Sequence, residues 1–93
     1  MKYYLNSVLL EGVTKGSAIL FDNDETVRFD LEGDYGTVTI VIPPKQVDLG
    51  KTTLVNLTRG KAVRVVGKLY QMLPESDFSS VVIEAEHIEW RSA

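Results

Sequence analysis

An alternation of apolar and polar residues in the last third of the chain constrains the fold more than any other feature. The stretch that begins at Arg59 reads R-G-K-A-V-R-V-V-G-K-L-Y-Q. One parity carries the apolar residues Val63, Val65 and Leu69, and the other carries Arg64, Lys68 and Tyr70. Successive side chains of a strand point to opposite faces, so this pattern predicts a strand with one face in a core. The other face would carry two cations and an aromatic ring, which suits phosphates and unstacked bases.

Similar patterns predict strands along most of the chain, and the second and third of them form a hairpin. They are expected at Tyr4–Glu11, Ser17–Phe21, Thr26–Leu31, Thr37–Ile42, Arg59–Met72 and Val81–Trp90. One short helix is expected over Asp48–Thr58, where Asp48 would cap it and Gly60 would close it. A barrel lets such strands share one core without exposed edges. We therefore predict an all-β, five-stranded OB-fold barrel with one short helix between strands 3 and 4.

The composition is that of one small domain, residues 1–93, and it excludes several kinds of chemistry. The absence of cysteine removes disulfides, thiolate nucleophiles and cysteine zinc sites. No apolar run approaches the roughly 20 residues of a membrane span, and the N-terminus lacks the features of a signal peptide, so we expect a cytoplasmic protein. The net charge of −3 opposes a nucleic-acid ligand, although a local basic patch can act against it.

No motif in the sequence indicates an enzyme. His87 is the only histidine, which excludes a metal site or a proton relay built on several histidines. Gly50-Lys51-Thr52 resembles the end of a phosphate-binding P-loop, but Lys45 stands where that motif requires its first glycine. The acidic run Asp22-Asn23-Asp24-Glu25 lacks calcium-loop spacing and is expected to be a turn. We therefore expect no catalysis, metal or cofactor.

Four segments of the chain, taken in order, resemble the bacterial single-stranded-DNA-binding protein family. Leu5–Gly12 resembles the family's opening N-x-V-x-L-x-G strand, and Val38–Ile42 sits where its third strand runs. Leu57–Leu69 resembles its L-x-K-G-x-x-V-x-V-x-G-x-L stretch, and Val82–Trp90 its closing V-x-A-D-x-V-x-F strand. The resemblance implies an OB-fold domain that binds single-stranded DNA with little sequence preference, in DNA replication and repair. It also implies a homo-oligomer, a dimer or a tetramer, with the first strands paired.

The strand pattern and the resemblance together select a ligand face and a subunit interface. The expected nucleic-acid-binding residues are Arg28, Tyr35, Thr37, Thr39, Arg64, Lys68 and Tyr70, with the two tyrosines as stacking platforms. The expected oligomer interface contains Leu5, Ser7 and Leu9, which share one parity of the first strand. Trp90 matches a family residue that packs the end of the barrel.

The chain also departs from the family's pattern, and the departures define an alternative function. Most of the family's stacking aromatics have no counterpart here, and Val41 stands where an aromatic is common. The chain ends at Arg91-Ser92-Ala93 without the acidic tip that recruits replication and repair enzymes, so it would correspond to the binding domain alone. The alternative is an OB-type protein-interaction or assembly module. RNA is a further alternative ligand, because no residue signals a preference concerning the 2'-hydroxyl.

Overall fold

Six strands and one helix make up the part of the chain that the computed structural model describes, residues 6–21, 26–71 and 81–91. In chain order they are β1 (Val8–Thr14), β2 (Ile19–Phe21), β3 (Thr26–Gly33), β4 (Gly36–Ile42), α1 (Val47–Asn56), β5 (Ala62–Gln71) and β6 (Val81–Arg91). Among these residues no helix has the length and apolar composition needed to cross a membrane.

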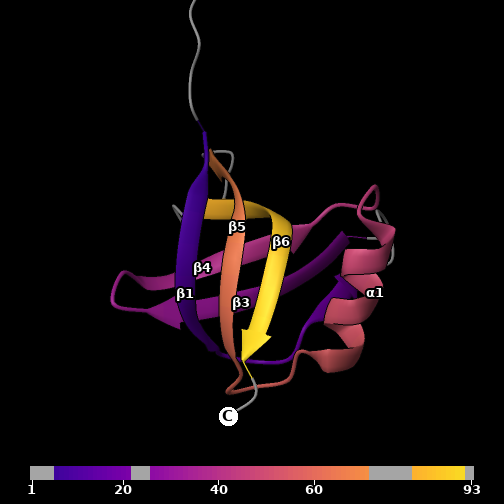
Figure 1. The fold of residues 1–93 in the computed structure, drawn as a ribbon, viewed down its shortest axis with the longest axis horizontal. Helices are drawn as coiled ribbons and strands as arrows, with labels where there is room; N and C mark the ends of the chain where they lie inside the picture. The colour runs from indigo at the N-terminus through magenta and orange to yellow at the C-terminus, as the bar shows by residue number, and fades with distance from the viewer. Residues whose placement is uncertain (1–5, 22–25, 72–80, 92–93) are drawn as a thin grey trace, which may run out of the picture.

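The strands close into a barrel. Their order is β1-β5-β6-β4-β3-β2, and β1 also pairs with β3, which joins the two sides of the sheet. Both β1 and β2 pair with β3, through Thr14↔Leu31 and Ile19↔Arg28, so together they form one interrupted barrel strand. β1, β5 and β6 lie on one side, β3 and β4 cross behind them, and α1 lies beside the barrel (Figure 1). The predicted five-stranded OB-fold barrel, with its helix between strands 3 and 4, is confirmed.

The core is built from the parity that the alternation predicted. Val63 and Val65 of β5 are buried, as are Ile40 and Ile42 of β4. The rest of the buried cluster is Val27, Phe29, Leu31, Leu57, Ile83, Ala85 and Ile88, and Trp90 packs against it as the resemblance implied. Leu69 departs from the pattern because it is 48% exposed. Parity alone therefore does not ensure burial near the end of a strand.

The helix begins after Pro43–Pro44, where β4 ends because proline has no N–H to donate to a ladder. It starts one residue before Asp48, and Gln46 is its N-cap without a side-chain hydrogen bond, so the prediction that Asp48 caps the helix is wrong. Gly50 faces the barrel, and a Cβ there would lie 3.3 Å from Val27 Cγ2. This glycine lets the helix approach the sheet closely.

The first strand lies further along the chain than expected, because β1 covers Val8–Thr14 rather than Tyr4–Glu11. At its start the side chain of Asn6 takes the place of a backbone partner. Asn6 Oδ1 accepts from the Leu69 N–H at 2.8 Å, and Asn6 Nδ2 donates to the Leu69 carbonyl at 3.1 Å. The side-chain amide thus adds one rung to the β1–β5 ladder.

Candidate nucleic-acid interface

The predicted ligand residues lie on two different sides of the barrel. One side is the outer face of β3 and β4, here called the β3–β4 face, and it includes the predicted residues Arg28, Thr37 and Thr39. The outward residues of this face are Arg28, Asp30, Glu32, Thr37, Thr39 and Val41. Arg64 and Lys68 point out of β5, which lies between β1 and β6. Figure 1 shows β3 and β4 crossing behind β5, so in a closed barrel the outward residues of the two groups face different directions. The predicted residues therefore do not share one ligand face.

Arg64 is paired with carboxylates on both neighbouring strands. Its Nη2 lies 2.9 Å from Glu11 Oε1 on β1, and its Nη1 lies 3.6 Å from Glu89 Oε2 on β6. His87 Nε2 lies 3.3 Å from Glu89 Oε1, two residues away along β6. A guanidinium held by two carboxylates has little free charge for a phosphate, so the role predicted for Arg64 finds no support in its contacts.

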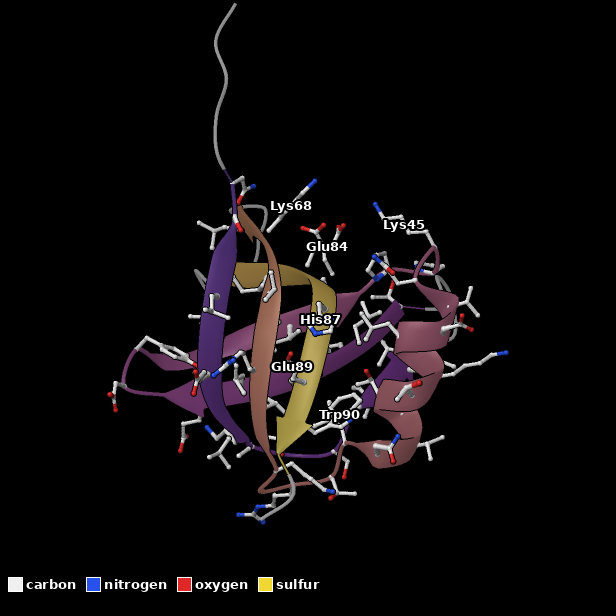
Figure 2. All side chains as sticks on the ribbon, viewed as in Figure 1. Lys45, Lys68, Glu84, His87, Glu89 and Trp90 are labelled. Carbon is white, nitrogen blue, oxygen red and sulfur yellow. The ribbon has the colours of Figure 1, made fainter. Side chains whose placement is uncertain are left out.

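Lys68 lies in a second charged row at one end of the barrel. Its neighbour on β6 is Glu84, and Glu84 Oε1 lies 3.5 Å from Lys45 Nζ. Figure 2 shows these three side chains close to one another, with His87 and Glu89 further down β6. The row therefore contains two cations and one carboxylate, and its ion pair joins Lys45 to Glu84. Tyr70 pairs with Val82 through its backbone, but its side chain is outside the described part of the structure.

The β3–β4 face offers hydroxyls and apolar surface but little positive charge. Arg28 is its one cation, and Asp30 and Glu32 are its two carboxylates. Thr39 Oγ1 donates to Asp30 Oδ1 at 3.2 Å, so one carboxylate is engaged within the face. Val41 lies opposite Arg28, where an aromatic was expected from the resemblance. Any polyanion on this face needs cations from a neighbouring part of the molecule.

Tyr35 is a fixed aromatic ring at the β3–β4 turn, and it covers the inward sides of Gly33 and Gly12 rather than the outer β3–β4 face. It sits in the turn between β3 and β4, which Gly36 closes with a φ of 98° that suits glycine. Its hydroxyl donates to the Glu11 carbonyl at 3.0 Å, and a Cβ on Gly33 would lie 2.6 Å from the ring atom Cε2. The ring thus packs on glycine backbone and is still 42% exposed.

Burial raises the pKa of the Tyr35 hydroxyl above its ordinary value of 10.0, and the Asp34 carboxylate raises it further. The folded state holds this proton more tightly than the unfolded state, so the stability gained is present below about pH 10 and is lost as pH rises through the raised pKa. Tyr35→Phe removes this titration together with the hydrogen bond, which contributes about 1 kcal/mol. We expect the stability advantage of the wild type over Tyr35→Phe to shrink as the pH rises above about 10 in urea unfolding. An advantage that stays constant with pH would contradict this account.

The structure describes two of the three residues predicted for the oligomer interface. Leu9 is 61% exposed and lies beside Val66 on the outer side of β1 and β5, and Ser7 is exposed just before β1. Leu5 lies outside the described residues, as does the acidic turn 22–25. Leu9 and Val66 form a small apolar area between the two charged rows. The outward position predicted for Leu9 is observed, and the interface itself stays a prediction.

No protein-family model and no curated protein sequence matches the chain. Solved structures do match it. The S. pombe Stn1–Ten1 complex aligns with a TM-score of 0.73 and 14% identity, over 96% of this chain and 60% of that chain. A complex of TiaS with a tRNA and ATP aligns with a TM-score of 0.71 and 19% identity, over 90% and 18%. A tRNA fluorescent labeling enzyme aligns with a TM-score of 0.75 and 18% identity, over 94% and 18%.

These similarities establish the fold and nothing finer, because all three identities are below 20%. The chain spans less than two thirds of each of these proteins. Fold and surface together define an OB-fold module whose described residues form a barrel with two distinct outer faces. Sequence reasoning missed Glu11 and Glu89 as partners of Arg64. Their own outward parity was the available signal, but the strand register was needed to place them beside Arg64.

Proposed function

We propose that this chain binds single-stranded DNA weakly and with little sequence preference, with Tyr35 at the β3–β4 turn as its stacking platform. The observation that carries the proposal is the Tyr35 ring, which is half exposed and is held in place at this turn against β1. An aromatic ring that is already fixed loses little entropy when a base stacks on it. Thr37 is exposed close to this turn, on the outer side of the same hairpin, and can donate to a phosphate or sugar oxygen.

Two further observations support a nucleic acid as the ligand class. The sequence resemblance to the bacterial single-stranded-DNA-binding family covers most of the chain in order, and the chain has the OB-fold barrel that this resemblance implied. Two of the similar solved structures are named for tRNA. Identities this low do not carry a ligand over, so RNA is tested beside DNA. The proposal requires neither catalysis nor a cofactor.

Titration of a labelled oligo-dT at low salt tests the role of Tyr35. Stacking on an aromatic contributes about 1–3 kcal/mol per base, so Tyr35→Ala should weaken binding by roughly 5- to 150-fold. Tyr35→Phe keeps the ring and should bind nearly as well as the wild type. Equal affinity of Tyr35→Ala and the wild type would move the site elsewhere. Absence of binding by the wild type at low salt would end the proposal, and a preference for oligo-rU would change the ligand to RNA.

Self-association through β1 and β5 is the second part of the proposal. Leu9 and Val66 are apolar side chains at the surface of β1 and β5, beside the Glu11–Arg64 ion pair, so a second copy can cover them. Leu9→Asp should therefore reduce the sedimenting species to the monomer at micromolar concentrations, whereas Val55→Asp, an exposed site on α1, should not. A wild type that sediments as a monomer would refute this part. An oligomer that binds no nucleic acid would favour the protein-interaction module instead.

A further inference from the structure

Two connections meet at the end of the barrel where β6 finishes. We call them the base loops: residues 15–18, between β1 and β2, and residues 57–61, between α1 and β5. In Figure 1 both run along the bottom of the barrel, near the end of β6. Thr14 joins them, because its N–H donates to the Lys61 carbonyl at 2.8 Å and its carbonyl accepts from the Gly60 N–H at 2.8 Å.

The side chain of Thr14 strengthens this junction. Its Oγ1 donates to the Thr58 carbonyl and accepts from the Lys61 N–H at 2.8 Å. Thr14 is only 2% exposed, and Gly60 adopts a φ of 84°, which lets the chain turn sharply there. The backbone on both sides of Arg59 is therefore held in one conformation by four hydrogen bonds to a single residue.

The base loops carry an uncompensated positive charge. Lys15, Arg59 and Lys61 are exposed, and none of them makes an ion pair with any other residue that the structure describes. The sequence shows the same segregation, because residues 12–21 and 49–74 contain no aspartate or glutamate. Two carboxylates of the neighbouring strands have partners of their own: Asp30 accepts from Thr39, and Glu89 pairs with Arg64. In a chain of net charge −3, this is a distinct cationic region.

This region and the Tyr35 ring both lie along β1. The Lys15 N–H donates to the Asp30 carbonyl at 3.0 Å, and Asp30 is the neighbour of Thr39 on the β3–β4 face. Tyr35 reaches β1 at the Glu11 carbonyl, four residues before Lys15. At about 3.3 Å per residue, Glu11 and Lys15 are roughly 13 Å apart along the strand. That separation is well within a site of about 4–16 nucleotides on one OB fold.

We infer that Lys15, Arg59 and Lys61 hold the phosphates of the nucleic acid whose bases stack at Tyr35. The inference rests on the proposed function and replaces Arg64 and Lys68 as the phosphate-binding residues. A fixed loop carries Arg59, whose planar guanidinium matches phosphate oxygens, and the same junction carries two lysines that act as point charges. An acidic protein surface would satisfy the same charges, but continuity with the aromatic ring favours the nucleic acid.

The salt dependence of oligo-dT binding tests the inference. Arg59→Ala/Lys61→Ala removes two cations and changes the net charge from −3 to −5, and Lys45→Ala/Lys51→Ala does the same elsewhere on the surface. Each phosphate contact contributes about −0.7 to the slope of log K against log salt on single strands. The first variant should therefore bind more weakly and with a slope shallower by about 1.4, while the second keeps the wild-type slope. Arg59→Lys/Lys61→Arg keeps both charges and should restore the slope.

Two results would overturn the inference, and they differ from those that would refute the proposed function. If oligo-dT binding depends on Tyr35 but its slope is unchanged in Arg59→Ala/Lys61→Ala, the phosphates lie elsewhere. If poly-glutamate of equal charge competes as well as oligo-dT, the base loops are a site for an acidic protein. A wild type that binds no oligonucleotide at low salt would instead refute the proposed function itself. Circular dichroism of each variant checks that these exposed substitutions leave the barrel folded.

Discussion

Gly67→Ala should lower the free energy of unfolding by about 3 kcal/mol or prevent folding, because β5 and β6 are in direct backbone contact at this residue. The register between the two strands shifts between Val66 and Gly67. A Cβ on Gly67 would lie 2.1 Å from the Glu84 carbonyl oxygen and 3.1 Å from the Ala85 Cα. These are backbone atoms of a central strand, so no side-chain rotation relieves the overlap.

Urea unfolding followed by Trp90 fluorescence measures this effect, and Gly16→Ala is its control. A Cβ on Gly16 meets no atom within 4 Å, and Gly16 does not have a positive φ, so the same substitution should change stability by less than about 0.5 kcal/mol. If Gly67→Ala were as stable as Gly16→Ala, the close approach of the two strands would be wrong. The comparison thus tests the bulge that positions the second half of β6.

Thr14→Val should destabilise the barrel by about 2 kcal/mol, although the two side chains have nearly the same shape. The hydroxyl serves both base loops, and its loss leaves the Lys61 N–H and the Thr58 carbonyl without this partner in a partly buried site. An unsatisfied buried polar group costs about 1–3 kcal/mol. Because the same bonds fix the loop around Arg59, we also expect a modest loss of oligo-dT affinity with an unchanged salt slope.

Thr53→Val is the matched control for this change. Thr53 is also fully buried, and its Oγ1 donates to the Leu49 carbonyl at 2.7 Å, one turn earlier in α1. That carbonyl is already an acceptor in the helix ladder, so losing the hydroxyl should cost less than about 1 kcal/mol. Equal stability losses in urea unfolding for the two variants would mean that Thr14 has no special role in joining the loops.

The fold was predictable from the sequence because the alternation of apolar residues reports directly on burial. Val63 and Val65, or Ile40 and Ile42, lie inside because a strand has only two faces and the core takes one. Helix position was recovered to within two residues at each end, since prolines precede it and Leu57 must reach the core. The capping residue was misassigned because Asp48 lies inside the first turn rather than before it.

The candidate site was less predictable, because parity says that a side chain points outward but not in which direction around a closed barrel. Arg28 and Arg64 are both outward-facing, yet they belong to different faces. The partners of Arg64 depend on a register that no local pattern encodes. The charge of the base loops, in contrast, was visible as an acid-free stretch from Leu49 to Pro74. The sequence does not show that this stretch lies beside Lys15, because the hydrogen bonds of Thr14 bring the two together in the folded chain.

The position of β6 in the barrel has a consequence for synthesis on the ribosome. The last strand in chain order is an interior strand, antiparallel to β5 along most of its length and parallel to β4 through Thr39↔Val82. A nascent chain that has emerged only as far as Gln71 therefore exposes the unpaired edges of both β4 and β5. Assembly of this protein must wait until translation has passed Arg91, and ribosome-bound chains arrested before Val81 should be digested rapidly by a protease that spares the released protein.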